Sequence, residues 1–379
     1  MKLLLFVLAG LALLASPTLA DEAADAAYTE ALEAYKQQIR AIEELYSEYQ
    51  TADAGRQTQI NEELKPMVAE AKNKVDAMVD AALEKFKADP MADKEITALL
   101  ESVAEQHILG ANGNGGDQYE KAMPILEALV DAKHERGELA LWGVMAAVCV
   151  NEYDKADKFA KVAIASGARP GDSDDAKEVF GQAQRFLQDK DRYRARWERE
   201  KPIREAEAAA DNNPRVKMQL DKGDIVIELF EDQAPIATAN FISLVKKGFY
   251  DGVVFHRVLP RFMAQGGDPT GTGTGGPGYS IACECDKPDH RQHFRGTLSM
   301  AHAGKDTGGS QFFLCFVPTD FLDGRHTAFG RVVEGIEVIG DIQKIDPQER
   351  GGPQPDKIIK AEVLRDRGHD YDFKKLPGR

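Results

Sequence analysis

The spacing of apolar residues changes once along this 379-residue chain, and the change separates two architectures. Up to about residue 212, apolar side chains recur every three or four residues, which is typical of amphipathic helices. After the breaker Asn212-Asn213-Pro214 they alternate with polar residues, which is typical of strands. The chain is also too long for one ordinary core. We therefore expect a multi-domain protein with an all-helical N-terminal module and a mainly-β C-terminal domain.

Residues 1–20 have the composition of a signal peptide. Lys2 is followed by an apolar run from Leu3 to Ala15 and then by small residues up to Ala20, which is the order that a signal peptidase requires. An uncleaved membrane anchor is the alternative, but the run is shorter than the ~20 apolar residues that span a bilayer. We expect cleavage after Ala20, a periplasmic or secreted protein, and no stable membrane insertion after cleavage.

Two apolar stripes at helical spacing follow the signal segment. The first comprises Tyr28, Leu32, Tyr35, Ile39, Ile42, Tyr46 and Tyr49, and the second comprises Ile60, Leu64, Met67, Ala71, Val75, Met78, Ala82 and Phe86. A break over residues 51–57 separates them, so we expect an antiparallel helical hairpin over residues 21–93. Pro66 is expected to kink or restart the second helix because proline removes a helix hydrogen bond.

A short segment is repeated 34 residues apart, at Gln118–Ala122 and again at Glu152–Ala156. This is the period of a tetratricopeptide unit, and residues 94–190 resemble that family, although Trp142 and Gly143 are out of register with its signature. An irregular helical bundle is the alternative. Residues 191–212, dense in Arg, Glu and Ala, are expected to form a helical linker.

Charge and cysteine content exclude some classes of protein. The net charge is −15, and from Asn213 onward 22 basic residues nearly balance 23 acidic ones, which leaves 26 basic and 40 acidic residues on the N-terminal part. That acidity argues against a nucleic-acid partner, which needs basic patches. Four cysteines are too few for a disulfide scaffold.

The β domain is predicted to open with a hairpin and a helix. Val216–Leu220 and Ile225–Leu229 alternate in polarity on either side of the turn at 221–224. Pro235 then stands where a helix would begin, and Gly248 stands just past its expected end.

Five short sequence blocks in the C-terminal part together form a pattern that is specific to one protein family. They are Phe255-His256-Arg257, Arg261 to Asp268, Leu298 to Ala303, Gly309 to Phe313 and Phe321 to His326. In order and spacing they resemble the core blocks of the cyclophilin family, over roughly residues 214–366. The resemblance implies a closed eight-stranded antiparallel barrel with capping helices, peptidyl-prolyl cis/trans isomerase activity, no cofactor, and Pro-containing polypeptides as clients. We assign 213–367 to this domain and 368–379 to a C-terminal tail.

The chemistry requires a group that weakens amide resonance. An X-Pro bond resists rotation by ~18–20 kcal/mol because its nitrogen shares a lone pair with the carbonyl. A guanidinium that donates a hydrogen bond to the prolyl nitrogen favours the twisted amide, and we assign that role to Arg257. By resemblance the catalytic residues are Arg257, Gln265, Phe313 and His326, and the substrate-binding residues are Phe262, Met263, Ala301, His302, Gln311, Phe321 and Leu322.

Two positions depart from the family pattern. Phe321 stands where many cyclophilins carry Trp, and His302 stands where Asn is common. The indole donor at the pocket edge is therefore absent. Because neither residue supplies the cation, we expect changed ligand preference, including toward cyclosporin, rather than lost turnover.

We expect no metal site, although Cys283, Cys285, His290 and His293 offer four candidate zinc ligands within eleven residues, at an unorthodox spacing. The two cysteines could instead be free thiols or a strained disulfide, and Cys315 is expected to be a buried apolar residue.

Two rival functions accompany the isomerase hypothesis. In the first, the helical repeats recruit a protein partner and the barrel binds Pro-containing segments without catalysis, as a scaffold or chaperone. In the second, the cysteine and histidine cluster buffers zinc. Taken singly, an arginine on a strand is more often part of a surface ion pair, and residues such as Phe262 or Phe313 are more often plain core.

Overall fold

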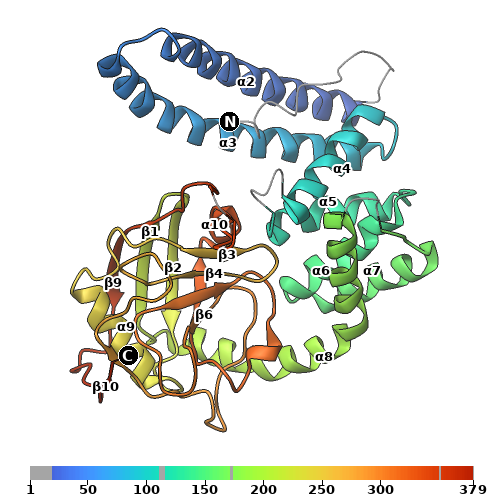
Figure 1. The fold of residues 1–379 in the computed structure, drawn as a ribbon. Helices are drawn as coiled ribbons and strands as arrows, with labels where there is room; N and C mark the ends of the chain where they lie inside the picture. Colours follow the sequence, from blue (N-terminus) through green and yellow to red (C-terminus); the bar gives the residue numbers. More distant parts are fainter. Residues whose placement is uncertain (1–18, 111–115, 171–173, 350, 379) are drawn as a thin grey trace. The chain divides into compact units, whose positions relative to one another are not determined.

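The computed structural model describes residues 19–110, 116–170, 174–349 and 351–378, which form two compact units (Figure 1). Of these, the described residues up to 105 together with 124–139 make the first unit, and the described residues of 106–123 and from 140 onward make the second. The predicted signal segment lies, up to residue 18, outside the described residues, so export stays a prediction. The domain boundaries expected from sequence also stay predictions.

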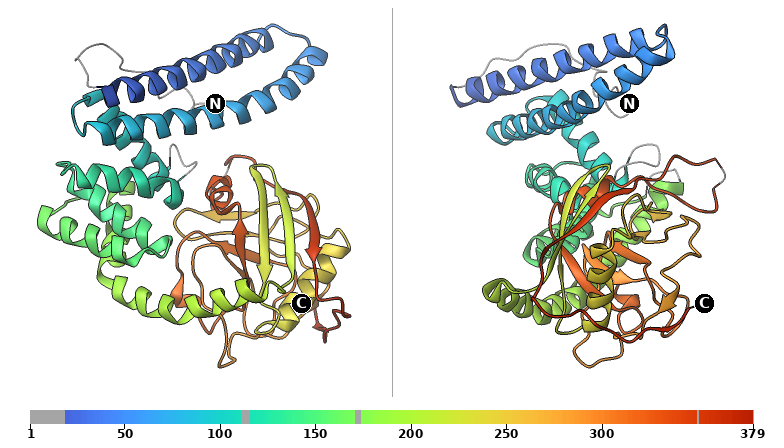
Figure 2. Two further views of the ribbon diagram at one scale, coloured as in Figure 1. Left: turned by 180° about the vertical axis from the view of Figure 1, so that it is seen from behind. Right: turned by 90° about the vertical axis from the view of Figure 1, so that its left-hand side faces the viewer.

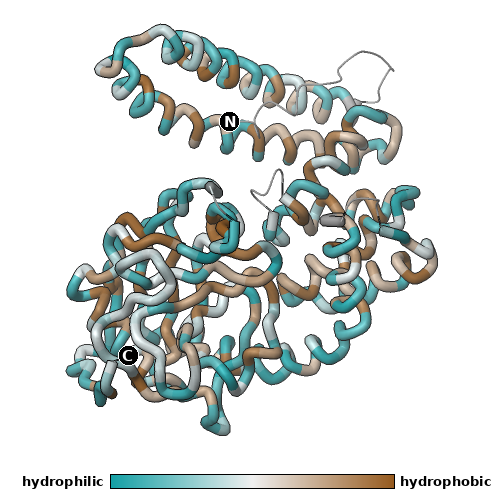
Figure 3. The backbone as a smooth tube through the Cα atoms, in the orientation of Figure 1, coloured by the Kyte–Doolittle hydropathy of each residue, from teal (hydrophilic) through white to brown (hydrophobic). Residues whose placement is uncertain are grey.

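The first unit contains the expected helical hairpin. Helix α2 (Leu19–Tyr49) and helix α3 (Ala54–Ala88) run antiparallel, and polar and apolar residues alternate along both (Figures 1 and 3). Asp53 caps α3 by accepting a 2.9 Å hydrogen bond from the Arg56 amide. The predicted stripes supply the buried face, including Tyr35 and Ile60. Helix α3 continues through Pro66, so the expected restart does not occur there.

Four shorter helices follow: α4 (Lys94–Leu109), α5 (Tyr119–Asp131), α6 (Gly137–Cys149) and α7 (Tyr153–Ser166). The two repeat copies begin α5 and α7. Tyr119 and Tyr153 are both buried, and Ala122 and Ala156 are both fully buried. The tyrosine and alanine positions are thus buried in both copies, whereas Gln118 is buried and Glu152 is exposed, and the tetratricopeptide resemblance itself stays a prediction.

Gly143 of α6 allows close packing with α7. A Cβ atom at this position would lie 2.5 Å from the ring of Phe159, which is fully buried. No side chain fits there without displacing the ring, because protein interiors are close-packed.

Helix α8 (Asp174–Ala210) includes residues 191–210 of the predicted linker 191–212 and leads from the preceding helices to the sheet (Figure 2). Within the described ranges, no helix combines the length and apolarity needed to cross a bilayer.

The C-terminal part is an eight-stranded antiparallel sheet in the order β3-β4-β7-β6-β8-β2-β1-β9, curled into a half-barrel (Figures 1 and 2). Its strands are β1 (Arg215–Leu220), β2 (Gly223–Leu229), β3 (Arg257–Leu259), β4 (Met263–Gly266), β6 (Thr297–Met300), β7 (Phe312–Cys315), β8 (Ala328–Glu334) and β9 (Ile358–Arg365). A bridge between Val254 and Lys357 links the segments that precede the edge strands β3 and β9. Strands β5 (Tyr279–Ser280) and β10 (Leu376–Pro377) form a separate pair.

The expected elements at the start of this domain are confirmed. Strands β1 and β2 pair with Val216 opposite Ile227 and Met218 opposite Ile225. Helix α9 (Pro235–Lys246) begins at the predicted proline, and Gly248 follows it with a φ of 66°. Helix α10 (Ile336–Asp341) and the 3₁₀ turn η2 (Asp320–Leu322) complete the domain. The expected fold class, a helical N-terminal region with a cyclophilin-type antiparallel sheet, is confirmed. The expected closed barrel is instead a half-barrel, because the described edge strands β3 and β9 do not pair with each other.

The sheet separates a large core from a small apolar cluster. Ala264, Leu314 and Leu298 belong to the large core, which includes Phe241 of α9. Their alternating neighbours Met263, Phe313 and Cys315 form the small cluster. Since side chains alternate across a strand, β4 and β7 present this second face toward the candidate site.

Candidate active site

A groove of about 800 Å³ lies over the small cluster. It is lined by ten of the eleven residues that the resemblance assigned to catalysis or substrate binding: Arg257, Phe262, Met263, Gln265, Ala301, His302, Gln311, Phe313, Leu322 and His326. The structure therefore brings these residues together, although their individual roles stay predictions.

Strand register places the central residues in one row. Arg257 of β3 is paired with Gln265 of β4, Gln265 with Phe313 of β7, and Phe313 with Ser299 of β6. Directly paired residues point to the same face of a sheet. The cation, the amide and the aromatic ring therefore share one face, although they come from three strands.

A chain of amides forms the polar side of the groove. Arg257 Nη1 donates to Gln265 Oε1 at 3.4 Å, and Gln265 Nε2 donates to Gln311 Oε1 at 3.0 Å. The Arg257 guanidinium also lies 5.7 Å from the ring centre of Phe262. Within the described part of the chain, no carboxylate lies within ion-pair distance of Arg257. Its remaining donors are thus available to a ligand.

Phe313 and Met263 form the apolar floor, with exposed fractions of 5% and 1%. His326 sets its ring edge against Phe313, with the ring centres 5.6 Å apart, and stacks on His302 at 4.1 Å. Burial lowers the pKa of His326, more than the hydrogen bond to the Met300 carbonyl raises it. A neutral imidazole at physiological pH fits a wall of the pocket better than a proton donor.

Comparison with known proteins decides the family. The family model "Cyclophilin type peptidyl-prolyl cis-trans isomerase/CLD" matches residues 215–363. A peptidyl-prolyl cis-trans isomerase of Helicobacter pylori is 52% identical over 146 residues, covering 38% of this chain and 88% of its own length. The chain belongs to the cyclophilin family. A second such isomerase, from Synechococcus elongatus, is 52% identical over 152 residues, covering 39% of this chain and 95% of its own length.

A solved cyclophilin-type isomerase of Cryptosporidium parvum aligns with 41% of this chain and 99% of its own length, at 31% identity and a TM-score of 0.37. The family and the named relatives establish this cyclophilin as an enzyme of the peptidyl-prolyl cis-trans isomerase class, EC 5.2.1.8. The helical N-terminal half lies outside residues 215–363, which the family model matches.

The Gly-rich loop of the cyclophilin domain is ordered by Asp268, a role that sequence reasoning missed. Its carboxylate accepts hydrogen bonds from the amides of Thr270, Gly273 and Gly275 at 2.6–3.0 Å. Gln311 Nε2 donates to the carbonyls of Gly273 and Gly275 at 3.0 and 2.9 Å. An Asp ahead of a Pro-Thr-Gly sequence is an Asx-turn signal that could have indicated this role.

Phe321 is the assigned residue that does not line the groove. Its side chain is 59% exposed, and its ring centre lies 5.8 Å from that of Phe262. It therefore stands at the rim of the cyclophilin groove, where a tryptophan would present its indole N–H to a ligand.

The four candidate zinc ligands are not gathered into a site. His293 is fully buried, and its ring nitrogens contact Asp323 and Ser299, both at 2.8 Å. Across the described ranges, no cluster of three or more His, Cys, Asp or Glu is placed to hold a metal. Cys283 and Cys285 are free thiols whose pKa values burial raises, which disfavours the thiolate that binds metal. Cys315 is fully buried, as expected.

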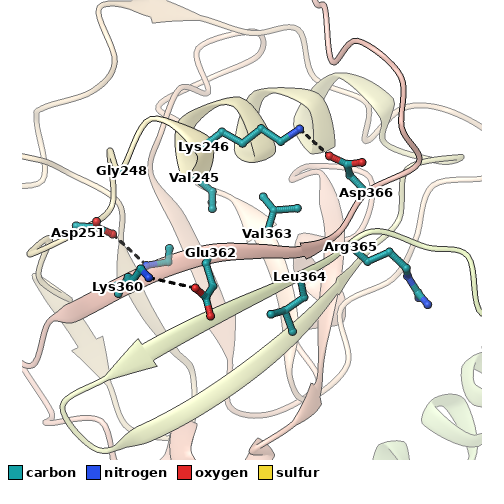
Figure 4. A pocket seen from close by; sticks show the side chains of 11 residues that line it. Val245, Lys246, Gly248, Asp251, Lys360, Glu362, Val363, Leu364, Arg365 and Asp366 are labelled. Atoms are coloured by element: carbon teal, nitrogen blue, oxygen red, sulfur yellow. Dashed lines mark hydrogen bonds and ion pairs between the residues drawn. The ribbon is translucent and has the colours of Figure 1, made fainter.

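A second concavity of about 570 Å³ lies between β9 and the end of α9 (Figure 4). Its charged side chains form ion pairs or hydrogen bonds with neighbouring groups. Lys246 pairs with Asp366 at 2.6 Å, Lys360 pairs with Glu362 at 3.2 Å, and Asp251 accepts from the backbone of Ala361 at 3.0 Å. This surface lacks the convergent donors and apolar floor of the first groove.

Proposed function

We propose that this cyclophilin accelerates rotation about X-Pro bonds in exported polypeptides, without a covalent intermediate, and that Arg257 donates a hydrogen bond to the prolyl nitrogen. The observation that carries the proposal is the row formed by Arg257, Gln265 and Phe313 across β3, β4 and β7. It sets a cation beside an apolar floor of the right kind for a proline ring.

The proposed chemistry acts on the lone pair of the amide nitrogen. In the planar amide that pair is delocalised, whereas in the twisted amide it can accept a hydrogen bond. A donor at this position therefore binds the transition state more tightly than the ground state, which is the condition for a faster reaction. Gln265 would hold the guanidinium through its 3.4 Å hydrogen bond and would meet a substrate carbonyl with its amide.

The hydrogen bond from Arg257 is too weak to account for catalysis alone, so the apolar floor must contribute as well. One charge-assisted hydrogen bond contributes ~1.5–3 kcal/mol, which corresponds to about ten- to a hundred-fold in rate. Fixing the proline ring on Phe313 and Met263 while the other side of the bond rotates would supply further acceleration by orientation. Phe313 and Met263 pack together with Cys315 in one buried cluster, which supports this role of the floor.

Export is proposed from the composition of residues 1–20, with Lys2, an apolar run and a small-residue site ending at Ala20. N-terminal sequencing of the protein recovered from the periplasm or the medium tests it, and the expected first residue is Asp21. We also propose the helical N-terminal region as the surface for a protein partner, on the support of the 34-residue repeat.

The test of catalysis is the relaxation of a short X-Pro peptide from cis to trans with wild-type protein, Arg257→Ala and Arg257→Lys. We expect Arg257→Ala to lower kcat/KM about ten- to a hundred-fold, while peptide binding persists. Lys217→Ala is the matched control, since Lys217 is a cation on β1 that pairs with Asp224 at 2.7 Å. Full activity in Arg257→Ala would refute the assigned role. A wild-type protein that binds the peptide without turnover would favour the scaffold alternative.

A further inference from the structure

Helix α8 contacts the turn that carries one wall of the groove. The 3₁₀ turn η2 holds Phe321 and Leu322, and an acidic residue flanks each side of this pair. Arg192 of α8 forms an ion pair with Asp320, and Arg196 of α8 forms one with Asp323. The turn is therefore held to the helix on both sides of Phe321 and Leu322, of which Leu322 lines the groove.

The second of these ion pairs continues beneath the groove floor. Asp323 accepts from the backbone amide of His293 at 2.9 Å and contacts its Nδ1 at 2.8 Å. His293 Nε2 reaches Ser299 Oγ at 2.8 Å. The imidazole lies parallel to the ring of Phe313, with 6.0 Å between ring centres and 10° between planes. Arg196 is thus connected to the aromatic floor through two side chains.

The same helix also contacts Arg261, the residue before Phe262 of the groove. Gln182 Nε2 of α8 donates to the Arg261 carbonyl at 3.0 Å, and Arg261 Nη2 reaches Glu178 at 3.1 Å. Arg261 has a φ of 56°, an uncommon conformation for a residue with a side chain. Asp117 additionally accepts from its amide at 3.0 Å. Arg261 directly precedes Phe262, so these contacts set the direction in which that ring enters the groove.

Burial distinguishes the Arg196 contact from an ordinary surface ion pair. The side chains of Arg196 and Asp323 are 6% and 16% exposed, and Arg196 Nε also donates to Gln292 at 3.2 Å. Trp197, the next residue of α8, sets its ring edge against Phe294, with ring centres 5.7 Å apart. Removing one member of a buried pair leaves an uncompensated charge, which forces neighbouring groups to rearrange.

We infer that helix α8 is a positioning element of the isomerase site, in which Arg196 acts through Asp323 and His293 on the Leu322 wall and the Phe313 floor. The inference rests on the proposed location of proline binding at this groove. It assigns a catalytic contribution to a helix outside the family-matched residues 215–363. A small displacement of a positioning group can cost up to about a hundred-fold in rate.

The test compares full-length Arg196→Ala, Arg196→Lys and Arg194→Ala in the X-Pro peptide assay, with kcat and KM determined separately. Arg194 is the matched control because it lies on the same helix and contacts Tyr153 and Asp157 of α7 instead of the sheet. We expect Arg196→Ala to raise KM about five- to tenfold with a smaller change in kcat. Arg196→Lys should have a KM between those of Arg196→Ala and wild type, and Arg194→Ala should have the wild-type KM. The Leu322 methyl resonances should shift in Arg196→Ala alone.

Equal KM values in Arg196→Ala and Arg194→Ala would overturn the inference. If Arg196→Ala does not fold, Arg192→Ala gives the comparison, since that side chain is 53% exposed and holds Asp320. An unchanged KM in that variant would also overturn the inference, and we expect a rise of about threefold. Loss of turnover in Arg257→Ala alongside wild-type kinetics in Arg196→Ala would reject this inference and leave the proposed function standing.

Discussion

Gln265 donates a 3.0 Å hydrogen bond from Nε2 to Oε1 of Gln311, which ties β4 to the residue that holds the Gly-rich loop. Because the two amides belong to one network, their effects should not add. We predict that Gln265→Ala and Gln311→Ala each raise KM about three- to tenfold, with a coupling energy of about 0.5–1.5 kcal/mol in the double variant. Steady-state kinetics of all four proteins measure the coupling. Strictly additive effects would show that the two amides act separately.

Asp268 should make the Gly-rich loop sensitive to acid only at very low pH. Desolvation raises its pKa, but hydrogen bonds from Gly275, Thr270 and Gly273 outweigh it and lower the pKa from 3.8 to about 2. A depressed pKa means that the carboxylate stabilises the fold fully above about pH 4, and that this contribution is lost as the pH falls toward 2.

We therefore predict that Asp268→Asn lowers the free energy of unfolding by about 1.5–3 kcal/mol near neutral pH, because a charged acceptor of three amides is replaced by a weaker one. The difference from wild type should shrink as the pH falls from about 4 toward 2, because the unfolded wild-type chain then takes up a proton at Asp268 before the folded protein does. Urea titrations at several pH values measure this. A difference that grows toward low pH would contradict the prediction.

Gly143→Ala should destabilise the helical part of the second unit without affecting the groove. The added Cβ would lie 2.5 Å from the Phe159 ring, so the ring or the helix must move. Overpacking of this kind costs about 1–3 kcal/mol. Thermal unfolding should show a lower midpoint, while KM and kcat stay at wild-type values. Gly181→Ala on α8 is the control, because nothing lies within 4 Å of its added Cβ. Equal midpoints for the two variants would refute the prediction.

Phe321→Trp should strengthen cyclosporin binding more than it changes turnover. Phe321 is 59% exposed at the groove rim, so a larger ring can be accommodated, and the indole supplies a hydrogen-bond donor that phenylalanine lacks. One added hydrogen bond corresponds to about a tenfold gain in affinity. Competition of cyclosporin against the X-Pro peptide measures it, with Phe321→Leu as the control that adds no donor. An affinity equal to wild type would show that the rim donor does not matter.

The sequence pattern was sufficient to predict those helices and strands whose conformation depends on a short stretch of chain. The alternation of Val216, Met218 and Leu220 predicted a strand, and their side chains are buried in β1. Pro235 marked the start of α9 because its fixed φ suits the first helical turn. At Pro66, which was expected to kink or restart the second helix, α3 continues without a restart, although the proline cannot donate the hydrogen bond of that turn.

The family blocks named the residues of the groove, but not their arrangement. Arg257 and Phe313 are far apart in sequence, and the row that joins them through Gln265 depends on the register of three strands. His293 shows most clearly that spacing along the sequence does not determine which side chains meet in the fold. Sequence spacing suggested a zinc ligand near Cys283 and Cys285, whereas the fold buries it between Asp323 and Ser299.

The amino-acid sequence by itself determined the helical and strand-forming halves, the cyclophilin family and the residue types at the groove, because periodicity and motif blocks are local properties. Only the tertiary structure decided that Arg196 of α8 pairs with Asp323 and that His293 lies against Phe313. The first contact joins residues 127 apart in sequence, and both contacts depend on how separate segments pack together in the folded domain, which no short stretch of sequence encodes.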